Sequence, residues 1–194
     1  MRPRMIAGAA VAASALTVPS ADADAAVLKK RMHVRVGDRA AVIGSAQPGV
    51  VTLQVRRRGV WRTIARDQTT ASGRYVLRDR VRRPMSVFAR VSVNGVTQRI
   101  GRLNGYRRAY ASWYGPGLYG NHLGCGGRLT PRRLGVAHRT LPCGSKLTLR
   151  HRGRSVTVRV IDRGPYVAGR EFDLTERTAR RLHFRGHGTI LTTR

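Results

Sequence analysis

Short stretches in which apolar and polar residues alternate fill the chain from about residue 27 to residue 103. Gly, Pro, Asn, Asp and Ser, the residues that favour turns, separate these stretches at short intervals. Alternation with a period of two places apolar side chains on one face of a strand and polar side chains on the other. The pattern predicts a small immunoglobulin-like β-sandwich with Trp61, Tyr75 and Phe88 in its core.

The second half of the chain shows a mixed pattern. The alternation stops at residues 104–109, which we interpret as a linker, and a segment dense in Gly and aromatic residues follows. That segment cannot form a regular helix, because its glycines favour tight turns. Alternating residues further on predict strands at residues 146–149, 155–161 and 189–193, the first two joined by a hairpin. These short strands predict a small β-barrel over residues 110–194.

One helix is expected within this barrel, in the sequence "DLTERTARRL". Leu174, Ala179 and Leu182 are spaced so that they share one helical face. Asp173 or Thr175 is placed to cap the first turn, with a Glu three residues after Asp173 as in a capping box. The predicted fold class is therefore all-β with one short helix.

Residues 1–25 have the features of a secretory signal peptide. A basic head at residues 1–4 precedes an apolar run at residues 5–18, and small residues alternate around a cleavage site at residues 21–25. The apolar run is too short to span a bilayer. An uncleaved signal anchor or a disordered N-terminus are the alternatives. We expect a secreted or cell-wall protein without a stable membrane anchor after cleavage.

The charge of the chain narrows the choice of partner. There are 38 basic residues against nine acidic ones, and the net charge of +29 favours an anionic partner. Nearly all of the basic residues are arginine, a bias that often follows genomic composition. Export and the lack of a recognisable nucleic-acid-binding motif lead us to expect an anionic wall polymer or a membrane surface rather than nucleic acid. A basic antimicrobial or nucleic-acid-binding secreted protein remains an alternative hypothesis.

The chain has two cysteines, Cys125 and Cys143. In an exported protein a single pair predicts a disulfide. The alternative is a metal site that also uses His122 or His138, but the spacing matches no common zinc pattern. We therefore expect neither a metal nor a cofactor.

One carboxylate stands out in "VRVIDRGPY", where an alternating strand stops at Asp162 and a turn follows. Asp162 could simply hydrogen-bond its own turn. It could also transfer a proton as a general acid, which must first hold that proton. The neighbouring Arg159 and Arg163 act against this role, because their charges favour the ionised carboxylate. Glu171 and Glu176 are expected to be solvated.

Three segments resemble a known family: "ASWYGPGLYGN", "GVAHRTLPCGSKLTLRHRGRSVTVRVIDRGPY" and "GREFDLTERTARRL". They are similar to the double-psi β-barrel domain of the RlpA (rare lipoprotein A) family, and more distantly to expansin and barwin-like barrels. The resemblance runs from about Ala111 to the C-terminus. It implies a six-stranded barrel in an exported protein that acts on peptidoglycan. Characterised members are lytic transglycosylases that cut glycan strands lacking stem peptides.

The resemblance also implies roles for individual residues. The family's catalytic Asp matches Asp162, its active-site His matches His138, and Asp173 matches a further acid near the same cleft. A Glu that the family often carries is replaced here by Gly127. The disulfide would pin the loop that bears His138 to the glycine-rich loop.

A lytic transglycosylase can use one carboxyl group, because the 6-hydroxyl of the sugar is its nucleophile. By resemblance, Asp162 would be this general acid/base, and His138 would orient it or share the proton. Candidate contacts to the glycan, each of which could instead be a packing residue, are Arg163, Tyr166, Trp113, Tyr114 and Tyr119. The expected partner is the peptidoglycan glycan strand. The alternative is an expansin-like protein that binds and loosens the wall without cutting it.

Overall fold

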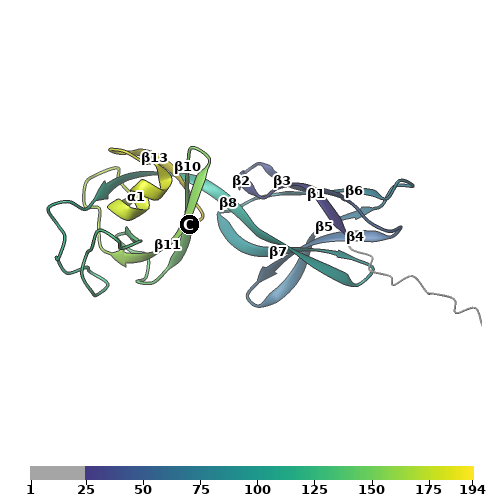
Figure 1. Ribbon diagram of the computed structural model, residues 1–194, viewed down its shortest axis with the longest axis horizontal. Coiled ribbons are helices and arrows are strands. Elements are labelled where there is room, and N and C mark those ends of the chain that lie inside the picture. The colour runs from purple at the N-terminus through teal and green to yellow at the C-terminus, as the bar shows by residue number, and fades with distance from the viewer. Residues whose placement is uncertain (1–24) are drawn as a thin grey trace, which may run out of the picture.

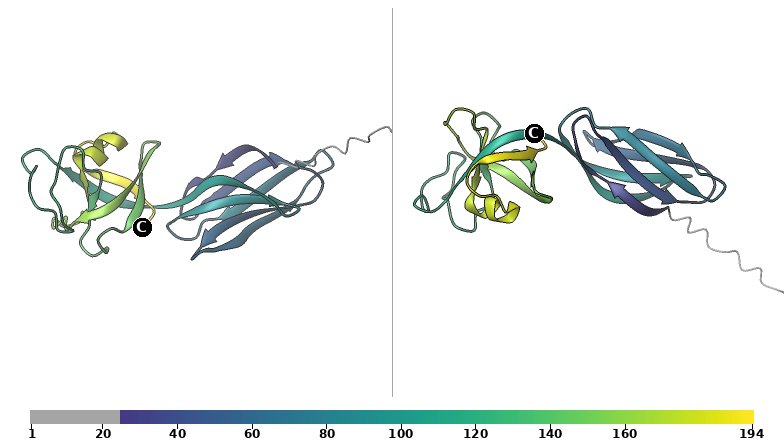
Figure 2. Two further views of the ribbon diagram at one scale, coloured as in Figure 1. Left: turned by 60° about the horizontal axis from the view of Figure 1, so that its bottom comes forward. Right: turned by 90° about the horizontal axis from the view of Figure 1, so that it is seen from above.

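The computed structural model describes residues 25–194, so the signal peptide expected at residues 1–25 lies outside the described residues except for Ala25. Two regions follow one another along the long axis of the molecule and are joined by strand β8 (Val96–Tyr114) (Figure 1; Figure 2). Each region has its own cluster of buried apolar residues, one between Ala25 and Leu103 and the other between Ala109 and Ile190. Within residues 25–194 no helix is long and apolar enough to cross a membrane.

The N-terminal region consists of two sheets over one core. The first sheet is antiparallel, in the order β1 (Ala26–Arg31), β3 (Arg39–Ser45), β6 (Arg74–Arg80). The second runs β5 (Val60–Gln68), β4 (Val50–Arg57), β7 (Met85–Val93), β8, with the short β2 (His33–Arg35) parallel to β8. Alternate residues are buried as the sequence pattern predicts, for example Val51, Leu53 and Val55 in β4. The immunoglobulin-like assignment of this region stays a prediction.

Only one of the three aromatic residues expected in this core lies in it. Tyr75 is 1% exposed, which confirms its prediction. Phe88 is 52% exposed, and the guanidinium carbon of Arg102 lies 4.3 Å from its ring centroid. Trp61 is only half-buried and is covered in the same way by Arg90, also at 4.3 Å. The predictions for Phe88 and Trp61 are wrong, because both rings are covered by long arginine side chains through cation–π contacts rather than by the core.

Residues 104–109 are not the linker that the sequence suggested, because they lie inside β8. The first part of β8 pairs with β7 as far as Gly105, which is opposite Met85. From Arg107 onward β8 pairs with β13 (Gly188–Thr192) instead. The hydrogen bonding of the strand thus passes from one region to the other with almost no interruption. The two regions are joined by a continuous strand rather than by an irregular segment.

The C-terminal region is a closed barrel of six strands, as the resemblance implied. Its strands besides β8 and β13 are β9 (Val136–Ala137), β10 (Lys146–His151), β11 (Arg154–Asp162) and β12 (Phe172–Thr175). They are hydrogen-bonded in the order β12-β9-β11-β10-β13-β8, and β8 pairs again with β12 to close the ring. Closure leaves no free sheet edge along this ring. Leu149, Val160 and Phe172 are fully buried inside the barrel.

The helix begins later than the sequence predicted. Asp173 and Leu174 belong to β12, because that segment is hydrogen-bonded to both β8 and β9. Helix α1 (Glu176–Leu182) follows directly, and the hydroxyl of Thr175 caps it by accepting a hydrogen bond from the backbone N–H of Thr178. Of the two cap candidates, Thr175 is therefore the cap and Asp173 is not.

Gly105 lies where β8 leaves the first region, and its lack of a side chain is required there. A Cβ at this position would lie 2.4 Å from a side-chain atom of Val81 and 2.9 Å from the carbonyl oxygen of Arg83. We predict that Gly105→Ala destabilises the N-terminal region by about 1–3 kcal/mol through overpacking. Urea unfolding followed through Trp61 in a Trp113→Phe background measures the change.

Thr97→Ala, at an exposed position of the same strand, is the matched control and should shift the free energy of unfolding by less than about 0.5 kcal/mol. An unchanged unfolding midpoint for Gly105→Ala would contradict the close approach of Val81 and Arg83 to this strand.

Candidate active site

Four residues form a row across four neighbouring strands of the barrel. Asp162 of β11 is paired with Ala137 of β9, Ala137 with Asp173 of β12, and Asp173 with Ser112 of β8. Side chains of directly paired residues project from the same face of a sheet. Asp162, Asp173 and Ser112 therefore share one face, and the small side chain of Ala137 separates the two carboxylates.

A β-bulge in β11 determines which face Asp162 occupies. Val160 pairs with Val136 and Asp162 pairs with Ala137, so two steps along β11 correspond to one step along β9. Ile161 is the additional residue. In a regular strand Asp162 would face the barrel core together with Val160, because residues two apart share a face. The bulge turns Asp162 to the outer face of the barrel.

The glycine-rich segment packs over this outer face. Leu123 and Leu129 from that segment form a small buried cluster with Ile161, and Tyr114 and Tyr119 pack against it. The backbone N–H of Cys125 donates to the carbonyl of Ile161 at 3.2 Å. The segment that the sequence left without regular structure is therefore a packed loop fixed to the bulge.

Two backbone N–H groups hold the carboxylate of Asp162. Its Oδ1 accepts from the N–H of Gly124 at 2.7 Å and from the N–H of Arg163 at 2.8 Å. Within the described part of the chain its Oδ2 makes no hydrogen bond. This close approach requires a glycine at residue 124. A Cβ there would lie only 2.8 Å from a side-chain carbon of Arg163.

Asp173 is partly buried on the same face. Its Oδ1 is buried and has no hydrogen-bond partner among residues 25–194. Burial raises the pKa of Asp173, and the negative charge of Asp162 adds to the rise. A hydrogen bond from the hydroxyl of Ser112 and the positive charge of Arg170 lower the pKa by less. Asp173 therefore keeps its proton to a higher pH than an ordinary aspartate does.

Tyr114 lies beside both carboxylates. Burial raises the pKa of Tyr114, and the charge of Asp162, a hydrogen-bonding approach to its carboxylate and then the charge of Asp173 add to the rise. The hydroxyl is buried and makes no hydrogen bond of normal geometry to the described residues. Buried polar atoms without partners are rare in folded proteins. Two of them, the hydroxyl of Tyr114 and Oδ1 of Asp173, occur here near the carboxylate of Asp162. A polar ligand would satisfy both atoms.

His138 reaches this site through its backbone rather than through its ring. Its N–H donates to the carbonyl of Asp162 at 3.2 Å. Its Nδ1 accepts hydrogen bonds from the N–H groups of Thr140 and Leu141 at 3.1 and 3.0 Å, so the ring proton lies on Nε2. The Nε2 atom lies 3.7 Å from Oε1 of Glu171. Burial lowers the pKa of His138, although Glu171 acts in the opposite direction. No contact joins the imidazole to the Asp162 carboxylate, both of which lie in the described part of the chain.

Glu171 and Glu176, expected to be solvated, are both engaged within the protein. Arg107 donates to both carboxylate oxygens of Glu171. Burial acts to raise the pKa of Glu171, but Arg107 and then His138 lower it. Glu176 accepts a hydrogen bond from the hydroxyl of Tyr119. The sequence missed both pairs because their members lie more than 50 positions apart along the chain.

The remaining candidate residues fall into two groups. The guanidinium of Arg163 donates to the carbonyls of His138 and Leu141 and to Sγ of Cys143, so it holds the loop that precedes β10. Tyr119 is likewise engaged within the protein. Trp113 and Tyr166, in contrast, are 36% and 79% exposed and present accessible rings.

Cys125 and Cys143 form the disulfide that the sequence predicted. The bond joins the glycine-rich loop to the loop between β9 and β10. Gly124, which donates to Asp162, immediately precedes Cys125, so the disulfide restrains the position of one of the two N–H groups that hold the carboxylate. Because both sulfurs are bonded to each other, neither is available as a metal ligand.

Residues 107–193 match the family model described as Lytic transglycolase, and together with the closed six-stranded barrel this match makes the C-terminal region a double-psi β-barrel domain. With the curated relatives described next, it confirms the predicted resemblance of this region to the RlpA family.

Curated relatives of this region carry the RlpA name. A probable endolytic peptidoglycan transglycosylase RlpA from Synechocystis sp. is 42% identical over 106 residues, which cover 53% of this chain and 32% of the relative. The protein with the same name from Aquifex aeolicus is 42% identical, over 44% of this chain and 38% of its own. The endolytic peptidoglycan transglycosylase RlpA of Campylobacter jejuni is 42% identical, over 41% of this chain and 30% of its own. This chain thus spans about a third of the length of these relatives.

Among solved structures, a biofilm-associated protein (BSP domain) aligns with 76% of this chain and 28% of its own. The TM-score is 0.24 and the sequence identity is 11%, values too low to support an inference about fold.

We predict that Gly124→Ala weakens the hydrogen bond from residue 124 to Asp162. The new Cβ would overlap the Arg163 side chain, and the loop must move away from β11 at a cost of about 1–3 kcal/mol. Amide hydrogen exchange at residue 124 should accelerate about tenfold or more.

His122→Ala, at an exposed position of the same loop, is the control and should leave exchange at residue 124 unchanged. Equal protection of residue 124 in wild type and Gly124→Ala would show that the loop does not depend on this close approach.

Proposed function

We propose that this protein is a peptidoglycan-active lytic transglycosylase that acts outside the cytoplasm and leaves 1,6-anhydro-muramyl ends. The observation that carries the proposal is the pair Asp162 and Asp173, which share one outer face of a barrel that matches the Lytic transglycolase family model. The names of the curated relatives support the same activity.

The proposed reaction requires one proton-transfer group at the scissile bond. A hydrolytic glycosidase generally uses two carboxyl groups, one of which activates water or attacks the sugar. In the lytic reaction the 6-hydroxyl of the muramyl residue attacks its own anomeric carbon. One carboxyl group first gives its proton to the leaving glycosidic oxygen and then accepts the proton of that hydroxyl, so protons balance without water.

We assign this role to Asp162. The N–H groups of Gly124 and Arg163 fix the carboxylate through Oδ1, and in this proposal Oδ2 carries the proton. A fixed proton-transfer group is worth about 10²- to 10⁴-fold in rate. The bulge at Ile161 serves this role because it keeps Asp162 out of the core.

Asp173 and Tyr114 are assigned to substrate binding. The buried Oδ1 of Asp173 and the hydroxyl of Tyr114 both lack partners within the described residues, and polar groups of a sugar would complete their hydrogen bonding. Because the pKa of Asp173 is raised, its carboxyl remains protonated to a higher pH, which limits the repulsion between two neighbouring carboxylates. Trp113 and Tyr166 are the exposed rings on which sugars could stack.

His138 is assigned a positioning role. Its backbone N–H bonds to the carbonyl of Asp162, and its Nδ1 fixes the turn that follows, whereas its ring makes no contact with the carboxylate. Arg163 stabilises the same loop. Neither side chain is assigned a direct contact with the glycan.

One observation favours the alternative of a non-catalytic, expansin-like binder. Gly127 stands where the family often has a Glu, its backbone has a φ of +78°, and the atom nearest to an added Cβ belongs to Arg133. If the reaction needed a carboxylate from this loop, the protein would bind glycan strands without cutting them.

The test is mass spectrometry of the soluble products released from peptide-stripped sacculi. Wild type should release anhydro-terminated fragments, and Asp162→Asn should reduce their yield by about 100-fold or more. His122→Ala, at an exposed position of the neighbouring loop, should release as much as wild type.

Wild type that pellets with sacculi but releases no fragments, on a substrate that a control transglycosylase digests, would contradict the enzyme and support the binder. Undiminished release by Asp162→Asn would remove Asp162 from the reaction.

A further inference from the structure

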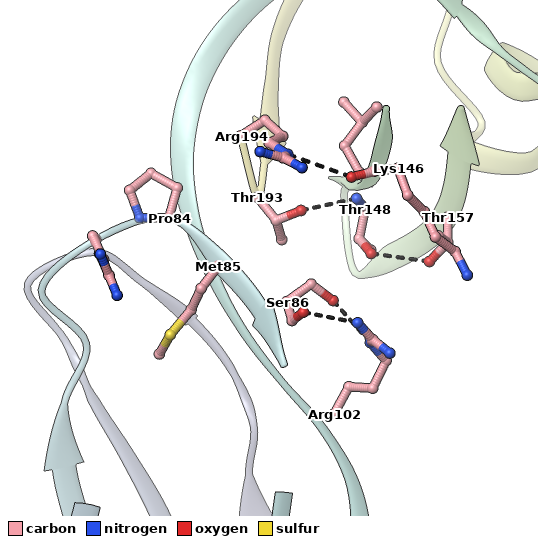
Figure 3. A pocket seen from close by; sticks show the side chains of 11 residues that line it. Pro84, Met85, Ser86, Arg102, Lys146, Thr148, Thr157, Thr193 and Arg194 are labelled. Carbon is pink, nitrogen blue, oxygen red and sulfur yellow. Dashed lines mark hydrogen bonds between the residues drawn. The ribbon is translucent and has the colours of Figure 1, made fainter. Parts of the chain in front are cut away.

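Three neighbouring cavities share lining residues, and we call them together the junction groove. The central cavity, of about 580 Å³, lies between the two regions (Figure 3). A second cavity, of about 660 Å³, extends over the N-terminal region and shares Arg83, Pro84 and Met85 with the first. A third, of about 340 Å³, shares Lys146 and Thr157 with the first and reaches Ile161. The groove therefore runs from the N-terminal sheet to the residue next to Asp162.

Basic side chains line the whole groove. Arg83, Arg102, Lys146 and Arg194 surround the central cavity, with Lys146 and Arg194 contributed by the barrel and the other two by the N-terminal region. In Figure 3 Arg102 and Arg194 lie on opposite sides of Thr148. In the part of the chain that the structure describes, no Asp or Glu lines any of the three cavities. The groove thus collects positive charge from both regions.

The basic character extends into the two flanking cavities. Arg56, Arg58 and Arg62 line the N-terminal cavity, and Arg133 and Arg159 line the cavity on the barrel. Like charges gathered along one groove repel one another, and an anion that binds among them lowers that repulsion.

These charges are not paired with carboxylates among residues 25–194. None of the ion pairs among the described residues involves a side chain of the groove. Burial raises the pKa of Asp79, which lies near enough to Arg57 for that charge to lower the pKa by a smaller amount. Arg102 donates to the Oγ and the carbonyl of Ser86, which holds its guanidinium in place while other N–H groups stay free.

The lining also indicates which kind of anion fits. None of the described residues that line the three cavities is aromatic. Single-stranded nucleic acids gain much of their affinity from bases that stack on aromatic rings, which this groove does not offer. Guanidinium groups bind phosphate in a two-pronged geometry. The lining therefore suits a flexible chain of phosphate groups without flat rings.

We propose that the junction groove binds a linear wall polymer of phosphodiester-linked polyols and carries it across both regions toward the barrel. The choice of a wall polymer rests on the proposed extracytoplasmic function, whereas the phosphodiester chemistry rests on the groove. Binding here does not require cleavage, because the groove ends beside Asp162 rather than at it.

The probe is soluble poly(glycerol phosphate), and its binding to the purified protein is measured by calorimetry at two salt concentrations. Wild type is compared with the triple variant Arg83→Gln, Lys146→Gln, Arg194→Gln. The control triple variant is Arg74→Gln, Arg78→Gln, Arg181→Gln, which removes as many exposed charges outside the groove. We expect the groove variant to bind at least about tenfold more weakly. The slope of the logarithm of its binding constant against the logarithm of salt concentration should fall in magnitude by about two to three. The control should lose less than about threefold.

Two further variants keep the outcome interpretable. Lys146→Gln alone should weaken binding about threefold with an unchanged thermal midpoint, so that a fault in folding of the triple variant is recognised. Asp162→Asn should bind the polymer as tightly as wild type does, which separates this proposal from the catalytic one.

Three results would overturn the proposal. The first is equal weakening by the groove and control variants, which would assign binding to the charge of the whole surface. The second is no saturable binding of the polymer by wild type. The third is binding of duplex DNA, at equal phosphate concentration, as tightly and with the same dependence on the groove residues.

Discussion

The candidate site depends on one irregularity, the bulge at Ile161. Without it Asp162 would continue the inward face of β11 and place a carboxylate in an apolar barrel core. An unpaired charge there would cost several kcal/mol. With the bulge, the carboxylate lies on the outer face that it shares with Asp173. The extra residue, Ile161, also anchors the glycine-rich loop, because its carbonyl accepts a hydrogen bond from the N–H of Cys125. One inserted residue thus fixes both the acid and the loop that holds it.

The second constraint is the continuity of β8. The strand exchanges β7 for β13 as its partner within two residues, so the two regions are connected through sheet hydrogen bonds rather than through a tether. This continuous strand brings residues of both regions around the cavity that lies between them (Figure 1; Figure 3). The same strand supplies Ser112 to the acidic row, and therefore links the N-terminal region to the candidate site.

Much of the barrel could be predicted from local sequence, because alternating strands, a cap and a cysteine pair are short-range signals. The failures have physical reasons. Residues 104–109 lose the alternation because residues 104–106 are buried in succession where the strand passes between the two cores, and two arginines that reach toward solvent follow them. Phe88 is apolar but lies under Arg102, a contact between neighbouring strands that periodicity does not encode. Glu171 and Arg107 are 64 positions apart, and only closure of the barrel brings them together. The face of Asp162 depends on a bulge that shifts the period by one residue.

The most direct test of this account is the titration of Asp173 by carbon-detected NMR, in wild type and in Asp162→Asn. The account predicts a pKa for Asp173 above the ordinary aspartate value in wild type, because its carboxyl is buried. It also predicts a fall in that pKa in Asp162→Asn, because the neighbouring charge is removed. A pKa for Asp173 in the ordinary range that does not respond to Asp162→Asn would contradict the shared outer face on which the proposed site is built.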